Sequence, residues 1–540
     1  MLSTMMDQAL TITSVMKFAK KNYPNQEIVS VTADNPQHRY TYNEAFQRVG
    51  QLANALVELG AKPGDVIGTM AWNDYRHLEL YYAISCSGMV CHTINPRLFD
   101  EQIEYIVAHA EDQYLFVDPL FVTKIEALKE KIPKVKAFIV LTSEKEMPRT
   151  ALRNVYCYES LIVDKSNEFG WPELNENDAS ALCYTSGTTG NPKGVVYSHR
   201  STVLHSYASS LPDALGFSRN DVLMPIVPMF HVNGWGIVYS ALMTGAKLVM
   251  PGPKMADGEI LTSLINQEKI TMSAGVPTVW LALLDYLEDS GKSIDSLKRV
   301  TVGGAACPLP IFKALYEKHG VETEHAWGMT EMSPLGTYNK MSPKDRDMPE
   351  DEFNQKLLRQ GRPIYGVDLR IVDEHGGELS WDGNSSGAVQ VRGPFVTAGY
   401  HKQQGGVTQD GWFETGDVAY MDKESRMQIT DRTKDIIKSG GEWISSIELE
   451  NLAMTHPAVA EAAVIGVAHE KWTERPLLVV VRKPDSGLTA EDILKFYHGK
   501  VATWWVPTEV VFVDELAHTA TGKLDKKTIR QWYNGYQWRD

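Results

Sequence analysis

The feature that most constrains this chain is the repeated alternation of short apolar runs with segments of helical periodicity. The apolar runs are DVIGTM at 65–70, LMPIV at 223–227, KLVM at 247–250, TMSAG at 271–275 and RVTVGG at 299–304. Strands separated by helices of roughly 10 to 20 residues form βαβ units with parallel sheets, whose ligands usually bind beyond the carboxyl ends of the strands. The pattern therefore predicts an α/β fold for the central part of the chain.

A helix with both ends marked is predicted over residues 41–60. Thr41 and Glu44 have the spacing of a capping box, and Gly60 is suited to end the helix. Between these ends, apolar residues recur at helical spacing, namely Phe46, Val49, Leu52, Ala53, Leu56 and Leu59. The segment should therefore form an amphipathic helix.

The pattern of predicted secondary structure changes twice toward the C-terminus. After about Gly361, short strands with frequent Gly and Asp predict a smaller β-rich subdomain that resembles a barrel. Residues 445–530 follow the order helix, strand, hairpin, helix, which is typical of a separate α+β domain. We therefore predict a large domain over residues 1–433, made of parallel-rich α/β subdomains and the barrel-like part, and a small α+β domain over residues 434–540.

Composition narrows the class of protein. The formal net charge of −15, from 53 basic and 68 acidic side chains, repels a nucleic-acid backbone. The five cysteines are odd in number and form no CxxC pair, which favours reduced core thiols over disulfides or zinc ligands. The sequence has no secretory h-region and no uncharged apolar run of about 18 residues. We therefore expect a cytoplasmic protein with no membrane span and no nucleic-acid partner.

The strongest local motif is ALCYTSGTTGNPKGVVYSHRS at 181–201, where an apolar strand runs into a loop of hydroxyls and glycines that ends at Lys193. The loop residues that we expect to contact phosphate are Thr185, Ser186, Gly187, Thr188 and Thr189. Their backbone N–H groups and hydroxyls can approach phosphate oxygens while the lysine neutralises charge. The loop is not a Walker A motif, because GxxxxGK[ST] is not matched. A flexible surface turn is the alternative interpretation, and it does not account for the coincidence of these features.

With this loop the chain resembles the adenylate-forming enzymes, which include acyl-CoA synthetases, adenylation domains and beetle luciferases. Further motifs follow in the order of that family: AWGMTEMSP at 326–334, GWFETGDVAYMD at 411–422, DRTKDIIKSGGEWISSIELE at 431–450 and TATGKLDKKTIR at 519–530. The resemblance covers nearly the whole chain, and the ordered set is far more specific than any single motif. It implies ATP, Mg²⁺ and coenzyme A as ligands, and a C-terminal domain that is mobile.

The resemblance also implies roles around the nucleotide. Glu331 falls where the family has a magnesium-linked carboxylate, and Thr330 where a hydroxyl meets the α-phosphate. Hard Mg²⁺ prefers oxygen ligands, so a carboxylate shared with phosphates is reasonable. Asp417 resembles the carboxylate that accepts both ribose hydroxyls, and Arg432 its cationic neighbour. Further residues assigned to the nucleotide and coenzyme A sites are Trp327, which offers a face to adenine, Gly328, Met329, Gly304, Ala305 and Lys438.

In the C-terminal part, Lys523 resembles the catalytic lysine that bridges the attacking carboxylate and the α-phosphate. A carboxylate is a poor nucleophile toward a polyanion, so a cation at their junction should stabilise the transition state. Lys434 falls at the hinge position of the family, and Gly440 and Gly441 would line a narrow tunnel for the pantetheine arm. The neighbouring cations Lys526, Lys527 and Arg530 are interpreted as solvated.

His231 and Trp235, in PMFHVNGWGI, resemble the stretch that walls and gates the acyl pocket of the family. A buried structural role is the alternative for both residues. Gly303 and Gly304 would let the adenylate and the acyl chain lie against bare backbone, and Pro334 completes the predicted pocket. We also assign His231 to the catalytic set.

The implied reaction converts a carboxylic acid and ATP to acyl-AMP and pyrophosphate, after which coenzyme A displaces AMP. The segments HVNGWGI, AGVPTVWLALLDYLE and SGGEWISSIELE resemble the branch of bacterial fatty-acyl-CoA synthetases and methylmercaptopropionate-CoA ligases. Because Trp235 and Trp327 could crowd the pocket, we expect a short or medium acid such as 3-(methylthio)propionate, with a long-chain fatty acid as the alternative. The resemblance further suggests a homodimer.

Three other functions share parts of this pattern. A luciferase-type monooxygenase shares all of these motifs and stays open at this point. A peptide-synthetase module is disfavoured because the chain ends at residue 540 without a carrier domain. A non-catalytic nucleotide-binding regulator would be expected to have lost Lys523 or Glu331, and both are present.

Overall fold

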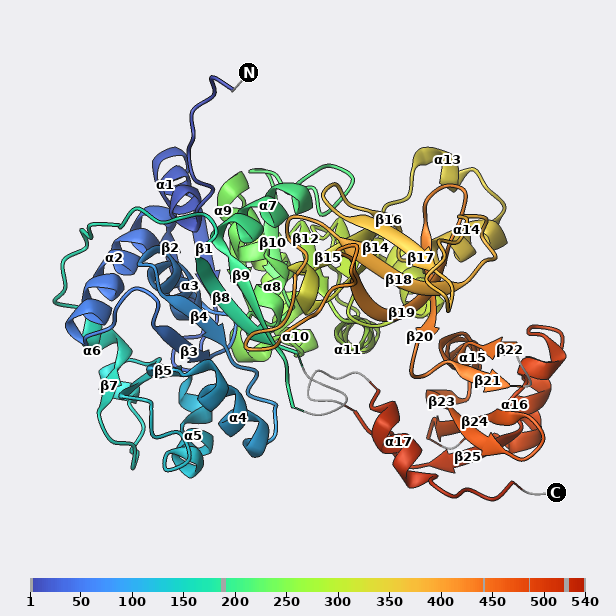
Figure 1. Ribbon diagram of the computed structural model, residues 1–540. Coiled ribbons are helices and arrows are strands. Elements are labelled where there is room, and N and C mark those ends of the chain that lie inside the picture. Colours follow the sequence, from blue (N-terminus) through green and yellow to red (C-terminus); the bar gives the residue numbers. More distant parts are fainter. Residues whose placement is uncertain (1–2, 186–190, 440–441, 485, 519–523, 539–540) are drawn as a thin grey trace.

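The computed structural model describes residues 3–185, 191–439, 442–484, 486–518 and 524–538. Its first sheet has seven strands in the order β7-β6-β5-β3-β4-β8-β9, all parallel except for the antiparallel edge strand β9 (Figure 1). These strands are β3 (Val66–Met70), β4 (Val90–Thr93), β5 (Tyr114–Val117), β6 (Ala137–Val140), β7 (Val155–Cys157), β8 (Ala179–Tyr184) and β9 (Gly194–Ser198). The accompanying helices are α2 (Tyr42–Glu58), α4 (Asp100–Ala110), α5 (Val122–Leu128) and α6 (Tyr158–Ile162).

The second sheet has nine strands in the order β16-β15-β14-β13-β12-β10-β11-β1-β2, parallel from β14 to β1 and antiparallel at both edges. Its strands are β1 (Glu27–Ser30), β2 (His38–Thr41), β10 (Val222–Pro225), β11 (Lys247–Met250), β12 (Met272–Gly275), β13 (Arg299–Val302), β14 (Glu322–Gly328), β15 (Leu335–Asn339) and β16 (Arg362–Pro363). The associated helices are α1 (Ile12–Asn22), α7 (His199–Ser209), α9 (Ile237–Thr244), α10 (Gly258–Glu268), α11 (Pro277–Ser290), α12 (Leu309–Lys313), α13 (Pro343–Arg346) and α14 (Glu350–Leu358). The parallel strands predicted from the apolar runs are therefore confirmed.

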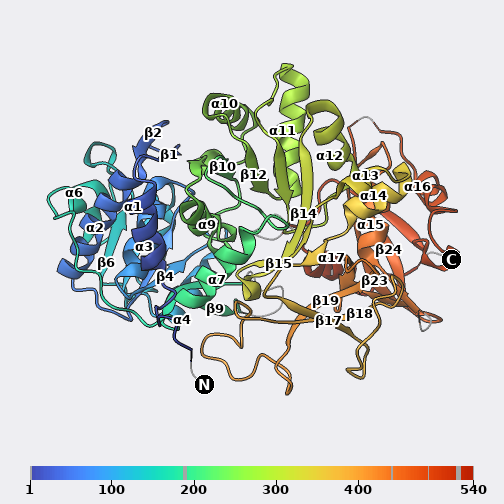
Figure 2. The ribbon, with the colours of Figure 1, turned by 90° about the horizontal axis from the view of Figure 1, so that it is seen from above.

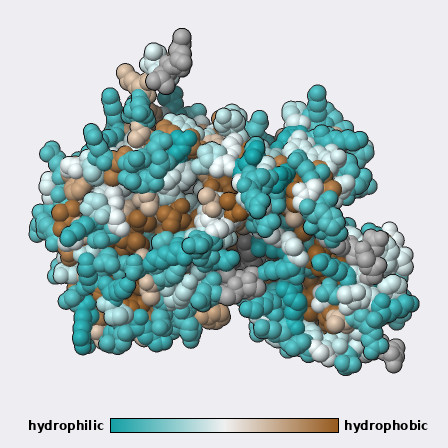
Figure 3. Space-filling view, viewed as in Figure 1, coloured by the Kyte–Doolittle hydropathy of each residue, from teal (hydrophilic) through white to brown (hydrophobic). Residues whose placement is uncertain are grey.

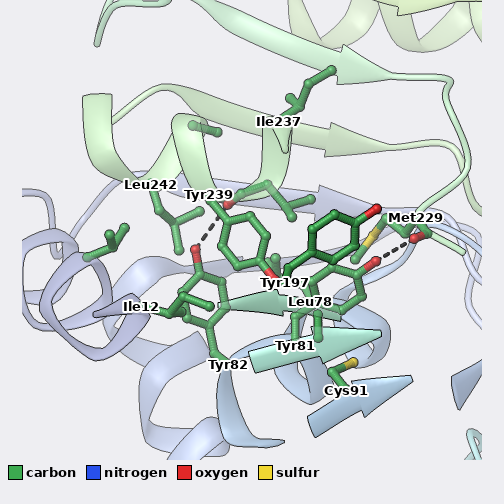
Figure 4. Close-up of a cluster of buried hydrophobic side chains, with 14 of the residues drawn as sticks. Ile12, Leu78, Tyr81, Tyr82, Cys91, Tyr197, Met229, Ile237, Tyr239 and Leu242 are labelled. Atoms are coloured by element: carbon green, nitrogen blue, oxygen red, sulfur yellow. Dashed lines mark hydrogen bonds between the residues drawn. The ribbon is translucent and has the colours of Figure 1, made fainter. Parts of the chain in front are cut away.

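Helix α3 (Tyr75–Cys86) lies between the two sheets, and all twelve of its residues are buried. It contacts β1 of the nine-stranded sheet and β3, β4 and β8 of the seven-stranded sheet. Two of its tyrosine hydroxyls donate to backbone carbonyls in and just before α9: Tyr82 donates to Val238 at 3.1 Å, and Tyr81 donates to Met229 (Figure 4). Since a helix that is buried all round has no face for water, its polar groups must be paired within the protein.

The C-terminal third contains two smaller sheets (Figures 1 and 2). One is antiparallel, with β17 (Asp368–Val372), β18 (Gly387–Arg392), β19 (Phe413–Met421) and β20 (Met427–Arg432) in that order. The other contains β21 (Ile437–Ser439), β22 (Glu442–Ile444), β23 (Val459–His469), β24 (Thr473–Arg482) and β25 (Glu509–Val513), with helices α15 (Ser446–Met454), α16 (Ala490–Tyr497) and α17 (Lys526–Trp532). The β-rich subdomain and the α+β pattern are thus confirmed. The proposed boundary at 433/434 falls between β20 and β21, and it stays a prediction.

Helix α2 has the start that the sequence predicts. The Thr41 hydroxyl accepts a hydrogen bond from the Glu44 backbone N–H, and the Glu44 carboxylate accepts one from the Thr41 N–H. All five cysteines are free, and all but Cys157 are buried. No helix in the described part of the chain is long and apolar enough to cross a membrane. Hydrophilic residues cover most of the face that Figure 3 shows.

The interpretation of Lys526 as a solvated lysine is wrong. Its side chain is buried under α15, where Nζ lies 2.8 Å from a Glu450 carboxylate oxygen and donates to the Ser446 hydroxyl at 2.6 Å. Ser446 in turn donates to Asp431 at the end of β20. Arg530 is also paired, with Asp435 at 2.7 Å, whereas Lys527 is exposed as expected. A linear run of cations conceals this difference, because only the face of α17 that packs on β23 and reaches Glu450 of α15 is buried.

We expect Lys526→Met to destabilise the protein by about 3–5 kcal/mol, because the Glu450 carboxylate would be left buried without its partner. Burial raises the pKa of Glu450 to about 7, against the lowering effect of Lys526. The folded chain therefore binds this proton more tightly than the unfolded chain, and the group lowers the free energy of unfolding as pH rises from about 4.5 toward 7. The decrease in the free energy of unfolding that Lys526→Met causes should therefore be larger at about pH 8 than at about pH 6.

Denaturant unfolding at these two pH values measures the effect, with Lys527→Met as the matched control on the exposed face of the same helix. Equal midpoints for the two variants would contradict a stabilising role for the Lys526–Glu450 pair.

Candidate active site

The hydroxyl-rich loop of the sequence connects β8 to β9, at the carboxyl end of the last strand of the seven-stranded sheet's parallel run. Its base is closed by two hydrogen bonds: Thr185 N–H donates to the Lys193 carbonyl at 2.9 Å, and Lys193 N–H donates to the Thr185 hydroxyl at 3.3 Å. Ser186, Gly187, Thr188 and Thr189 lie outside the described residues. The position beyond a strand end agrees with the general location of ligand sites in such sheets.

The segment after β14 makes a tight turn that carries Thr330 and Glu331. Met329 N–H donates to the Pro334 carbonyl at 3.0 Å, and a side chain on Gly328 would meet that same carbonyl oxygen at 2.0 Å. Glycine is therefore required at 328 for the turn to close. The Thr330 carbonyl accepts a 2.6 Å hydrogen bond from the Tyr197 hydroxyl on β9. The turn is thus attached to the strand that follows the hydroxyl-rich loop.

Glu331 is only 5% exposed, and the Tyr400 hydroxyl donates to its carboxylate at 2.7 Å. Burial raises the pKa of Glu331, while the Tyr400 hydrogen bond and the charges of Arg432 and Lys193 lower it. The ring of Tyr400 also lies 4.7 Å from the Lys193 ammonium, in the geometry of a cation–π contact. One tyrosine therefore holds the candidate metal carboxylate and the loop lysine at the same time.

Sequence reasoning missed Tyr400. The residue lies in a loop between β18 and β19, where no periodicity marks a side chain as buried or functional. Two backbone contacts fix this loop against the site, since Thr397 N–H donates to the Glu331 carbonyl and His401 N–H to the Gly194 carbonyl, both at 2.7 Å. Only the Gly-Tyr pair in TAGYHK could have drawn attention to it.

Asp417 lies on β19 and is 3% exposed. Trp327 Nε1–H donates to one of its carboxylate oxygens at 2.9 Å, and Arg432 Nε lies 3.0 Å from the other. The three predicted residues are thus brought together, and β19 and β20 place Asp417 directly opposite Arg432 in register. Trp327 itself is 7% exposed, and its predicted contact with adenine stays a prediction.

Trp235 lies against the turn that follows β13. A side chain added at Gly303 would come within 2.8 Å of the Trp235 ring, and one at Gly304 within 4.0 Å. The indole therefore occupies the space beside this bare backbone, and both glycines and Trp235 belong to one wall. Ala305 follows and is exposed, whereas His231 is half-buried at the start of the segment that carries Trp235.

That segment has an unusual backbone. Its positive φ angles are 46° at Val232, 51° at Asn233, 59° at Gly234, 56° at Trp235 and 71° at Gly236. Asn and Gly tolerate this left-handed region, but a β-branched residue such as Val rarely adopts it. Left-handed helical conformation costs roughly 1–2 kcal/mol per L-residue, so the surrounding protein must hold this turn in place. We call residues 232–236 the left-handed turn.

The remaining predicted residues are those that the sequence assigns to the hinge and the small domain, together with Pro334. Lys434 and Lys438 are exposed and flank the start of β21. Gly440, Gly441 and Lys523 lie outside the described residues. Pro334 follows Ser333 through a cis peptide bond in the turn after Glu331. The structure thus brings together Lys193, Glu331 and Tyr400 in one group and Trp327, Asp417 and Arg432 in another, joined through the segment from Trp327 to Glu331.

Comparison with known proteins identifies the family of this arrangement. Residues 17–401 match the AMP-binding enzyme family, and residues 448–523 match the AMP-binding enzyme C-terminal domain. The chain belongs to the AMP-binding enzyme family. The resemblance drawn from the motifs is therefore confirmed, and the ordered motifs lie within or beside the two matched regions.

Among similar proteins, a 3-methylmercaptopropionyl-CoA ligase from Ruegeria lacuscaerulensis is 49% identical over 98% of each chain. A medium-chain-fatty-acid–CoA ligase from Ectopseudomonas oleovorans is 47% identical over 99% of this chain and 98% of its own. A long-chain-fatty-acid–CoA ligase from Thermus thermophilus is 42% identical over 99% and 97%. The likeness to these proteins extends over both domains.

Solved structures agree with the fold. ATP-bound MatB from Rhodopseudomonas palustris aligns with a TM-score of 0.82 at 25% identity, covering 98% of this chain and 100% of that one. The anthranilate CoA ligase AuaEII, in complex with anthranoyl-AMP, aligns with a TM-score of 0.85 at 24% identity over 96% of each chain, which supports the fold alone. The predicted architecture of a large α/β domain followed by a small α+β domain is confirmed.

We expect Tyr400→Phe to weaken ATP binding in the presence of magnesium roughly tenfold or more, because a hydrogen bond to a charged group contributes about 1.5–3 kcal/mol. The phenyl ring keeps its contact with Lys193, so Tyr400→Leu should have a larger effect. Isothermal titration with ATP measures both variants. Tyr365→Phe, which removes a hydroxyl from an 84% exposed residue, is the control. Wild-type affinity in Tyr400→Phe would show that the hydroxyl does not organise the site.

Proposed function

We propose that this protein is an AMP-forming acyl-CoA ligase. It converts a carboxylic acid and Mg-ATP to acyl-AMP and pyrophosphate, and the thiol of coenzyme A then displaces AMP to give the thioester. The observation that carries the proposal is the joining of two groups, Lys193–Tyr400–Glu331 and Trp327–Asp417–Arg432, on one short segment. That geometry suits a triphosphate at one end and a ribose at the other, and full-length relatives named as CoA ligases support the same reaction.

In this proposal, one group of residues binds the phosphate end of the nucleotide and the other group binds the ribose end. The hydroxyl-rich loop and Lys193 bind the phosphates, with Thr330 at the α-phosphate, and Asp417 accepts the ribose hydroxyls beside Arg432. Glu331 would hold magnesium together with phosphate oxygens and water. A single buried carboxylate fits that ion, because Mg²⁺ in such sites takes one or two carboxylates and keeps phosphate and water ligands. The bound ion would neutralise charge on the phosphates.

The small domain supplies the remaining roles. Lys523 places a cation between the carboxylate and the α-phosphate during adenylation, when negative charge builds up at their junction. Gly440 and Gly441 would serve the second step, in which the pantetheine thiol must reach the acyl carbon. One active site can perform both steps if the domain reorients about Lys434 and exposes these residues in turn.

The acid itself we place among short or medium carboxylates, with 3-(methylthio)propionate as the first candidate. Relatives at 46% to 49% identity are named for that acid or for medium-chain fatty acids. Trp235 supports the choice, because its ring lies against Gly303 and would limit the depth of an acyl pocket there. A long-chain fatty acid is the alternative, since one relative at 42% identity is named for it. We further propose a cytoplasmic homodimer.

The proposal is tested by pyrophosphate release across a panel of acids, with and without coenzyme A. We expect release that depends on the acid, and accumulation of an acyl-CoA only when coenzyme A is present. Highest kcat/KM for 3-(methylthio)propionate or a medium-chain acid would support the substrate assignment. Absence of acid-dependent release with every acid would overturn the function as a whole.

We expect Lys523→Ala to abolish adenylation while ATP binding survives, since the lysine acts mainly on charge that develops in the transition state. Thioester formation from pre-formed acyl-AMP should persist in the variant. Lys527→Ala removes an exposed lysine from the same segment and serves as the control. Equal loss of both half-reactions in Lys523→Ala would instead indicate a structural role.

A further inference from the structure

The left-handed turn at residues 232–236 needs support from outside its own sequence, and Asn73 provides the first part of it. Asn73 is fully buried in the connection between β3 and α3. Its side-chain amide donates to the carbonyls of Pro225 at 3.0 Å and Val227 at 2.7 Å, and its oxygen accepts from Met229 N–H at 2.6 Å. Both amide hydrogens and the amide oxygen are therefore used to fix the strand end that leads into the turn.

The side chains of Tyr81 and Cys183 also donate hydrogen bonds to this part of the chain, at Met229 and Asn233. The Tyr81 hydroxyl, on the buried helix α3, donates to the Met229 carbonyl, so Met229 is fixed through both its N–H and its C=O (Figure 4). The Cys183 thiol donates to the Asn233 side chain at 3.4 Å within the turn itself. Three buried side chains, from the β3–α3 connection, from α3 and from β8, thus hydrogen-bond to the segment that connects β10 to α9.

The consequence of this course is the position of Trp235. Its φ of 56° is one that L-residues rarely adopt, and it aims the indole at Gly303. If the hydrogen bonds between Met229 and the side chains of Asn73 and Tyr81 were lost, the turn could relax toward an ordinary backbone conformation. The indole would then leave the Gly303 wall. In the described part of the chain, the side-chain hydrogen bonds and ring contacts of Asn73 and Tyr81 go to residues other than Glu331, Asp417 and Gly303.

We propose that Asn73 and Tyr81 are positioning residues that set the acid-size selectivity of the enzyme by fixing the left-handed turn and, through it, Trp235. This inference rests on the proposed acyl-CoA ligase function and on Trp235 as part of the acyl wall. Loss of the hydrogen bonds of Asn73 or of Tyr81 should raise kcat/KM for longer acids relative to shorter ones, because the indole no longer limits the depth of the acyl pocket beside Gly303. The effect reaches the acid only through Trp235.

The experiment compares kcat/KM for butyrate and decanoate, and reports their ratio. Tyr81→Phe removes one hydroxyl, and Asn73→Asp keeps the acceptor toward Met229 while losing both donors. Each should raise the ratio of decanoate to butyrate by roughly 2- to 10-fold, in line with the loss of a buried hydrogen bond. Trp235→Ala should raise the ratio further. In the Trp235→Ala background, Tyr81→Phe should no longer change the ratio, since coupled residues deviate from additivity.

Tyr82→Phe is the matched control. Tyr82 is the next residue of α3, is equally buried, and donates to Val238 in α9 rather than to the segment before the turn. Tyr82→Phe and Tyr81→Phe should lower the melting temperature similarly, and only Tyr81→Phe should change the ratio. If Asn73→Asp does not fold, Tyr81→Phe alone decides the outcome.

The outcomes separate the inference from the function. An unaltered ratio in Tyr81→Phe, with a changed ratio in Trp235→Ala, overturns the inference and leaves the function standing. An equal shift of the ratio in Tyr81→Phe and Tyr82→Phe, or a shift that persists without Trp235, also overturns it. An unaltered ratio in Trp235→Ala overturns both the inference and the acyl-wall assignment. Absence of acid-dependent pyrophosphate release in the wild type would overturn the proposed function and, with it, the inference that rests on it.

Discussion

Burial of α3 between two sheets is the constraint on which the rest of the large domain depends. The helix exposes none of its twelve residues, so its side chains must satisfy partners on both sheets at once. Its first turn is capped by Asp74, whose side chain accepts from His77 N–H at 2.9 Å, and Asn73 directly precedes this cap. Because interiors are packed at crystal density, such a helix fixes the separation and the relative rotation of the sheets. Loops that leave either sheet are therefore positioned against the same rigid element.

The acidic composition of the chain limits how its site can bind an anionic ligand. A chain with a formal charge of −15 must hold polyanionic ligands with local groups, and its site also contains buried carboxylates. Glu331 and Asp417 each accept a hydrogen bond from a neutral aromatic donor, the Tyr400 hydroxyl or the Trp327 indole. A neutral donor orients a carboxylate without cancelling its charge. In the proposed function, the carboxylates would thus bind a cation or a sugar hydroxyl and Lys193 would offset charge on the phosphates, while Arg432 pairs with Asp417.

The parts that the sequence predicts well are those governed by local rules. The capping box at Thr41, the strands at 223–227 and 299–304 and the order of elements after residue 445 follow from caps, periodicity and strand length. Lys526, Tyr400 and Asn73 were not predicted, because each is defined by a partner distant in sequence. Lys526 meets Glu450 across 76 positions, and a lysine beside other lysines gives no sign of burial. Motif comparison located most candidate site residues, but it could not show which side chains support them.

The left-handed turn shows why such support matters for function. The sequence HVNGWG contains Asn and two glycines that tolerate positive φ, yet Val232 and Trp235 oppose it. Local preference alone would not select this conformation, and its cost of roughly 1–2 kcal/mol per L-residue must be offset by tertiary contacts. Those contacts come from the connection before α3, from α3 itself and from β8. The placement of an indole beside the candidate acyl wall is thus determined by core residues far from the wall in sequence. Selectivity in such a site can therefore change through substitutions that never touch the acid, because a strained element transmits small shifts in its supports to the side chain it carries.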